Sequence, residues 1–156
     1  MTVSFNGLGN EGRLGNQMFQ YAFIRGMAKR YDYEWMVPDP DANRFDNYGL
    51  FDCFELTGCK NTGDSSYPTL ECRDTQFNQE FLDNCTDNTN YSGVFQTEKY
   101  FANVDKELRE DFTFKKVYLE PCKEFIDSVG DAIFLHVRRG SPNITGNRGK
   151  KWSYQM

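Results

Sequence analysis

A glycine-rich turn between a short strand and a long helical segment most constrains how this chain can fold. Residues 2–6 have the pattern of a strand, residues 7–15 form a loop with four glycines, and residues 16–30 have helical periodicity. A second strand is predicted at 33–37, where Pro38 ends it. Strand, loop, helix and strand in this order predict a βαβ unit, and therefore an α/β fold with a Rossmann-like open sheet and flanking helices.

The helix at 16–30 is expected to begin with Asn16 as its cap, because the side-chain oxygen of Asn16 can accept an unpaired backbone N–H. Apolar or small residues recur on one face and predict a stripe that faces the core, made of Phe19, Ala22, Phe23, Gly26 and Met27.

The pattern is weaker from residue 39 to residue 88, where we expect a loop region with one short strand and one short helix near 76–82. A strand is predicted at 91–96. The helical segment that follows, 98–112, has an apolar stripe and a charged face that is expected to be in water and includes Asp111.

A further helix is predicted at 120–129, with Pro121 in its first turn, where a missing N–H costs nothing. The next segment, AIFLHV at 132–137, has the composition of a buried strand and leads directly into Arg138 and Arg139. Two adjacent guanidiniums at the carboxyl end of a strand are suited to bind an anion, and a diphosphate is the expected one. A surface arginine pair that only caps the strand is an equally good explanation of these two residues alone. His136 is expected to share the face of Arg138, because side chains alternate along a strand.

Three sequence blocks resemble those of the α-1,2-fucosyltransferases, glycosyltransferase family 11. The blocks are GRLGNQMFQYA at 12–22, GVFQTEKYF at 93–101 and HVRRG at 136–140, and they occur in the family's order. The resemblance runs from about Val3 to Gly140 and is most specific in the first block. It implies that the chain is the N-terminal half of a GT-B-like glycosyltransferase.

The resemblance implies transfer of fucose from the donor GDP-fucose to the 2-hydroxyl of a galactoside, with inversion and without a metal. Arg138 and Arg139 would stabilise the negative charge on the departing diphosphate, and His136 would line the same cleft or orient the arginines. The residues expected to contact the donor are Arg138, Arg139, Gly15, Asn16 and Gln17. Helix capping is an equally good explanation of Asn16 and Gln17, and the general base is not identified.

Two departures from the family pattern affect this interpretation. Ser141 stands where the family usually has Asp, and the sequence given stops at Met156, soon after the arginines. We therefore expect an N-terminal α/β domain over 1–129 and, over 130–156, the arginine strand with a truncated start of the GDP-sugar-binding domain. Such a chain is expected to have little or no transferase activity alone.

Two other functions remain open. The segment from Gly7 to Gly12 matches G-x-G-x-x-G, with Asp32 and Glu34 about 20 residues further on, which is typical of an NAD(P)-binding protein. Against it, the predicted helix starts three residues too late. A carbohydrate-binding remnant without catalysis is the other alternative, since it would need only the acceptor side of the fold.

Composition limits the possible partners. The net charge of −5 and the pI of about 4.9 argue against nucleic-acid binding. Five cysteines without a Cys-x-x-Cys pair argue against zinc and favour free thiols. No segment reaches the ~20 apolar residues of a membrane span, so a cytoplasmic location is expected, or the Golgi membrane for an animal-type member whose anchor is not included.

Overall fold

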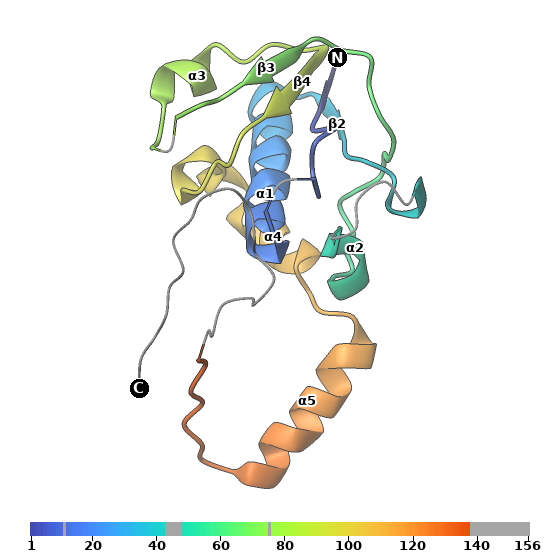
Figure 1. Cartoon of the computed structure of the whole chain (residues 1–156), viewed down its shortest axis with the longest axis vertical. Coiled ribbons are helices and arrows are strands. Elements are labelled where there is room, and N and C mark those ends of the chain that lie inside the picture. Colours follow the sequence, from blue (N-terminus) through green and yellow to red (C-terminus); the bar gives the residue numbers. More distant parts are fainter. Residues whose placement is uncertain (11, 43–47, 75, 138–156) are drawn as a thin grey trace, which may run out of the picture. The chain divides into compact units, whose positions relative to one another are not determined.

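The fold is built on a four-stranded parallel sheet (Figure 1). The structure is a computed structural model that describes residues 1–10, 12–42, 48–74 and 76–137. The strands follow the order β2-β1-β4-β3, with bounds β1 Thr2–Ser4, β2 Glu34–Met36, β3 Thr69–Glu71 and β4 Thr89–Ser92. In the register, Val3 of β1 lies opposite Trp35 on one side and Thr89 on the other. This confirms the predicted α/β class and open parallel sheet.

Helix α1, Leu14–Tyr31, connects β1 to β2 and completes the predicted βαβ unit. The prediction that Asn16 caps this helix was wrong. The residue at the cap position is Arg13, which is extended at φ −107° and ψ −174° and makes no side-chain cap hydrogen bond. The helix ends at Tyr31, and the left-handed backbone of Asp32, at φ 56°, lets the N–H of Tyr33 donate back to the carbonyl of Ala28 at 2.8 Å.

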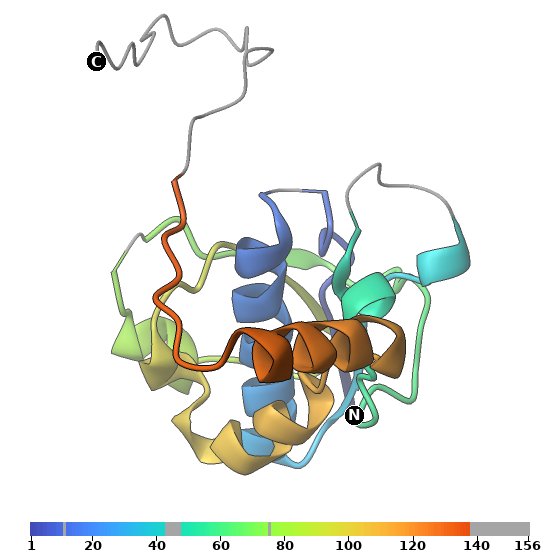
Figure 2. The ribbon, with the colours of Figure 1, turned by 90° about the horizontal axis from the view of Figure 1, so that it is seen from below.

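Helix α1 is buried on most of its circumference. The sheet and the segment after β4 both pack along it (Figures 1 and 2). Four of the five stripe residues predicted from periodicity are buried, and Phe19 is partly buried. The helix buries further residues outside that stripe: Gln17, Gln20, Tyr21, Ile24 and Ala28. A helix that is enclosed in this way is held by tertiary packing rather than by one amphipathic face.

The region between β2 and β4 contains short elements. A 3₁₀ turn, Pro40–Ala42, is followed by α2, Leu50–Cys53, and later by β3 and by α3, Gln79–Asp83. The side chain of Asn78 caps α3 by accepting from the backbone N–H of Phe81 at 2.7 Å. The predicted short strand and short helix of this region are both present.

The segment after β4 differs from the continuous helix predicted at 98–112. Two 3₁₀ turns, η2 Glu98–Tyr100 and η3 Ala102–Val104, precede a short helix, α4 Asp105–Asp111. Strand β4 itself ends at Ser92 rather than at residue 96. The backbone explains this early end, because Gly93 has φ 154° and Phe95 has φ 50°, and neither angle continues a strand.

Asp111 was predicted to lie on the solvated side of its helix, and that prediction was wrong. Its side chain is fully buried and accepts hydrogen bonds from the Tyr21 hydroxyl at 2.7 Å and the Gly58 N–H at 2.8 Å. Arg25 of α1 forms an ion pair with the same carboxylate. Burial, and next the hydrogen bond to Asp111, raise the pKa of Tyr21. Asp111 therefore ties α4 to α1 inside the protein.

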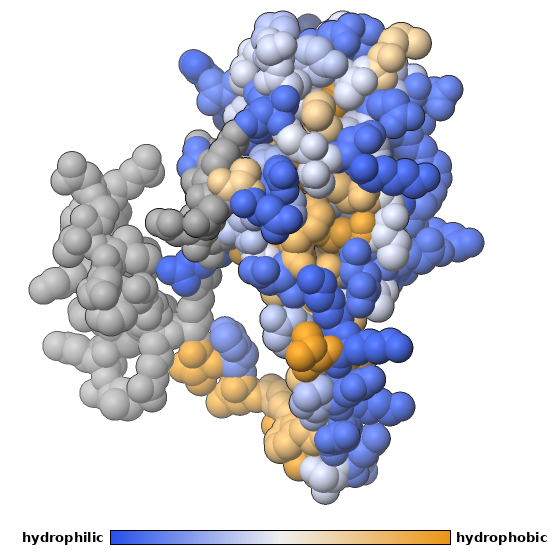
Figure 3. Space-filling model, turned by 90° about the vertical axis from the view of Figure 1, so that its right-hand side faces the viewer, coloured by the Kyte–Doolittle hydropathy of each residue, from blue (hydrophilic) through white to orange (hydrophobic). Residues whose placement is uncertain are grey.

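Helix α5, Lys116–Val129, begins four residues before the predicted start at 120, so Pro121 lies inside the helix rather than in its first turn. The compact unit that holds the sheet is Met1–Pro121, and a second unit begins at Cys122. Hydrophobic side chains gather along one side of α5 (Figure 3). None of the residues of α5 is buried, and its exposed large apolar residues are Val117, Tyr118, Leu119, Phe125, Ile126 and Val129.

The strand predicted at 132–137 is not formed. These residues have neither helix nor strand pairing within the described chain, and Ile133 and Leu135 are 101% and 86% exposed. A strand is stable only when a neighbour completes its backbone hydrogen bonds, and composition alone cannot provide that neighbour.

All five cysteines are free thiols, and Cys122 is the exposed one. Within the described ranges, no helix is both long enough and apolar enough to cross a bilayer.

Replacing Asp111 with Ala is expected to lower the free energy of unfolding by about 3–5 kcal/mol, because it leaves Arg25 without its charge partner in a site where the Arg25 side chain is only 14% exposed. Asp83→Ala is the matched control, since Asp83 pairs with Arg30 at the surface and should change stability by less than about 1 kcal/mol. Urea unfolding measures the change in the free energy of unfolding for both variants. Equal effects of the two variants would contradict the buried role of Asp111.

Candidate functional site

The glycine loop after β1 approaches the first turn of α1 closely. Gly9 and Gly12 have φ of 93° and 79°, which L side chains rarely adopt. A Cβ atom at Gly12 would lie 2.0 Å from Nδ2 of Asn16. Gly12 is therefore required both by its backbone angle and by its contact with Asn16.

Asn16 joins two of the sequence blocks that carry the family resemblance. Its Oδ1 accepts a hydrogen bond from Nε2 of Gln96 at 2.8 Å, across a separation of 80 residues. Asn16 belongs to the block at 12–22 and Gln96 to the block at 93–101. The first turn of α1 and the turn after β4 thus meet at the carboxyl side of the parallel sheet, which is where open α/β sheets bind ligands.

Gln20, one helical turn further along α1, makes a second contact with this turn. Its Nε2 donates to the carbonyl of Gly93 at 3.1 Å. Its Oε1 is buried and has no hydrogen-bond partner among the described residues. Buried amide oxygens are usually paired, so this atom is a place where a water or another donor would be accepted.

Phe95 lies in the middle of the turn after β4 and holds that turn against α1. Its φ of 50° is unfavourable for a bulky residue, yet its side chain is 2% exposed and stacks on Phe23 of α1, with ring centroids 3.5 Å apart. Packing against α1 holds the unfavourable backbone angle in place.

Gln17 and Gly15, the other two residues near the start of α1 that were expected to contact GDP-fucose, differ in burial and in their contacts. Gln17 is fully buried, and its Oε1 accepts from the N–H of Gly49 at 3.0 Å. The side chain of Gln17 thus connects α1 to the start of α2. Gly15 is exposed, and a Cβ atom there would meet nothing within 4 Å.

Sequence reasoning missed a polar network beside the carboxyl ends of β1 and β4. The N–H of Asn6 donates to Oδ1 of Asn90 at 2.8 Å, and Nδ2 of Asn6 donates to the carbonyl of Ser65 at 2.8 Å. Ser4, fully buried in β1, is 2.5 Å from Ser65 through the two hydroxyls. The pattern at 2–6 had predicted a strand, but nothing local indicated that Ser65 would be a partner of Ser4 and Asn6.

An apolar groove of about 760 Å³ lies between the first half of α1 and the segment 96–112. The apolar residues that line it are Met18, Phe19, Ala22, Phe101, Leu108 and Phe112. Polar side chains are also part of the lining: Gln96, Glu98, Asp105 and Arg109. Gly15 lines it too, so the groove adjoins the contact between Asn16 and Gln96.

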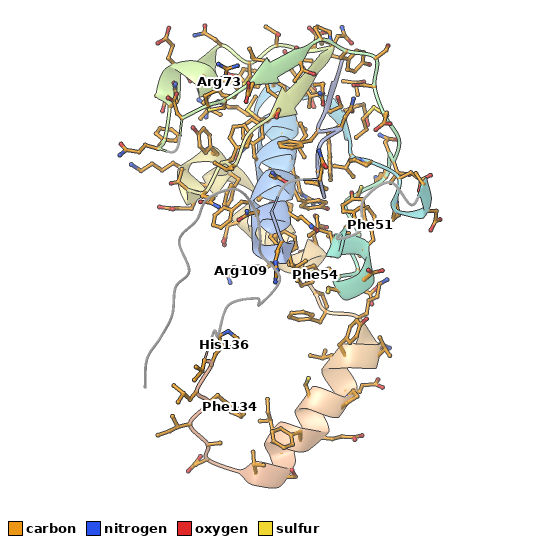
Figure 4. The ribbon with its side chains drawn as sticks, in the orientation of Figure 1. Phe51, Phe54, Arg73, Arg109, Phe134 and His136 are labelled. Carbon is orange, nitrogen blue, oxygen red and sulfur yellow. The ribbon has the colours of Figure 1, made fainter. Side chains whose placement is uncertain are left out.

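The arginine block is only partly described. Arg138 and Arg139 lie outside the described residues, as does Ser141. His136 is described and exposed, in the unpaired segment before them (Figure 4). Among the described residues, no group of three or more His, Cys, Asp or Glu side chains is arranged to hold a metal ion.

No protein-family model, curated protein or solved structure matches this chain.

Replacing Gly12 with Ala is expected to lower the free energy of unfolding by about 1–3 kcal/mol, because the new methyl group combines an unfavourable φ with a clash against Asn16. Gly15→Ala is the matched control. Gly15 is within α1 with open space around it, so alanine should leave stability unchanged or raise it by up to about 1 kcal/mol. Thermal and urea unfolding test both. A neutral Gly12→Ala variant would contradict the loop geometry.

Proposed function

We propose that this chain is part of an inverting glycosyltransferase that moves fucose from GDP-fucose to the 2-hydroxyl of a galactoside, with a GT-B-like arrangement. The observation that carries the proposal is the hydrogen bond between Asn16 and Gln96. Two sequence blocks that resemble the same family, far apart along the chain, are in contact at the ligand-binding edge of a parallel sheet. If the two blocks resembled the family only by chance, there would be no reason to expect them to be in contact in the fold.

In this proposal the diphosphate of the donor binds to Arg138 and Arg139. Each guanidinium can form two parallel hydrogen bonds to phosphate oxygens and keeps its charge at all physiological pH values. As the bond between fucose and GDP breaks, negative charge collects on the departing phosphate, and fixed positive charges lower the energy of that transition state. His136 would position the arginines. Gly15 and Asn16, at the start of α1, would contact the donor through the free backbone N–H groups of the first helical turn.

The NAD(P)-binding alternative is not favoured by the geometry at the start of α1. In a dinucleotide-binding motif the third glycine allows the helix to pack closely on the strand. Here Gly12 precedes the helix, which begins at Leu14, and its lack of a side chain makes room for Asn16 instead.

The test is titration of the 156-residue chain with GDP by calorimetry. An assay of labelled fucose transfer to lactose, run in parallel, is expected to show little or no turnover by this chain alone. We expect GDP to bind, and Arg138→Ala or Arg139→Ala to weaken binding at least about tenfold, because each removes charge-assisted hydrogen bonds to phosphate. Arg73→Ala is the control, since Arg73 is exposed and pairs with Glu71. Binding of NADH without binding of GDP, or equal effects of all three variants, would contradict the proposal.

A further inference from the structure

The groove between α1 and α4 has a composition suited to one class of ligand. Its lining is mainly apolar and includes the partly buried aromatic rings of Phe19, Phe101 and Phe112. Its volume of about 760 Å³ is within the range of small-molecule sites, about 300–1,000 Å³. All of its lining residues belong to the unit Met1–Pro121.

The charges at the rim restrict what can bind there. Glu98 and Asp105 are negative and Arg109 is positive, so the rim carries a net negative charge. Arg109 donates to Asp105 at 3.0 Å, and this hydrogen bond raises the pKa of the guanidinium above its usual value. A nucleotide or another anion would be repelled by the excess carboxylate. The groove therefore favours a neutral ligand over the donor.

A saccharide has both an apolar face and hydroxyl groups, and the apolar and polar residues of this groove complement these two features. One face of a pyranose ring presents C–H groups, which pack on apolar and aromatic side chains, and its edges present hydroxyl groups. Carboxylates accept hydrogen bonds from hydroxyls, and guanidinium and amide N–H groups donate to them. The amide of Gln96, the carboxylate of Glu98 and the guanidinium of Arg109 supply these groups at the rim.

We infer that this groove binds the galactoside acceptor, with its ring on the phenylalanines and its hydroxyls at Glu98 and Arg109. The identification as an acceptor rests on the proposed function, while the binding of a saccharide is measured separately. Gln96 lines the groove and also contacts Asn16. A sugar held here is thus next to Asn16, one of the residues proposed to contact the donor.

The experiment is a titration of the full 156-residue chain with lactose, in which binding is measured by calorimetry and by saturation-transfer NMR. Arg109→Gln and Glu98→Gln are expected to weaken lactose binding at least about fivefold, because each removes a charge-assisted hydrogen bond. Arg73→Gln and Glu80→Gln are the matched controls. Arg73, like Arg109, is an exposed arginine paired with a carboxylate, but it follows β3, does not line the groove and lies apart from Arg109 (Figure 4). Both controls should leave lactose affinity unchanged.

Circular dichroism confirms that each variant is folded, and GDP is titrated in parallel. The groove inference is overturned if lactose does not bind. It is also overturned if the groove variants and the control variants weaken lactose binding equally. Uptake of an apolar dye without lactose binding also overturns it, since the groove would then hold a hydrophobic ligand. Lactose binding that depends on Arg109 and Glu98, in a chain that fails to bind GDP, supports the groove and refutes the transferase proposal.

Discussion

One row of contacts between α1 and the turn after β4 organises the structure. Asn16, Gln20 and Phe23 are spaced so that they lie on one side of the helix. They contact Gln96, the carbonyl of Gly93 and the ring of Phe95, respectively. Further along α1, the lack of a side chain at Gly26 lets Phe101 approach, because a Cβ there would lie 2.9 Å from the Phe101 Cα. These contacts hold η2 and η3, which follow β4, against α1.

The same contacts explain why the turn after β4 keeps an unfavourable backbone. Phe95 is held at positive φ because its ring stacks on Phe23 and makes edge contacts with Phe5 and Tyr100. A locally unfavourable conformation that is fixed by packing is common at ligand-binding edges of proteins. In this chain it brings Gln96 beside the start of α1 and leaves an open groove on the outer side of that helix.

The sequence was informative where local pattern and final packing agree. Periodicity and turn residues predicted the βαβ unit and the core stripe of α1, because those segments carry their own turn and helix signals. It failed for Asp111, since an acidic residue in a charged stretch has no local sign of the partner, Arg25, that is 86 residues away. It also failed at 132–137, where an apolar composition predicts a strand but pairing depends on a neighbour elsewhere. The groove could not be foreseen, because its two sides come from separate parts of the chain.

A double-mutant cycle on Asn16 and Gln96 tests most directly whether these two segments meet as described. Asn16→Ala, Gln96→Ala and the double variant are compared by urea unfolding. The hydrogen bond at 2.8 Å predicts a coupling free energy of about 0.5–1.5 kcal/mol between the two substitutions. Additivity within about 0.3 kcal/mol would show that the two side chains do not interact, and the proposed ligand-binding edge would lose its structural basis.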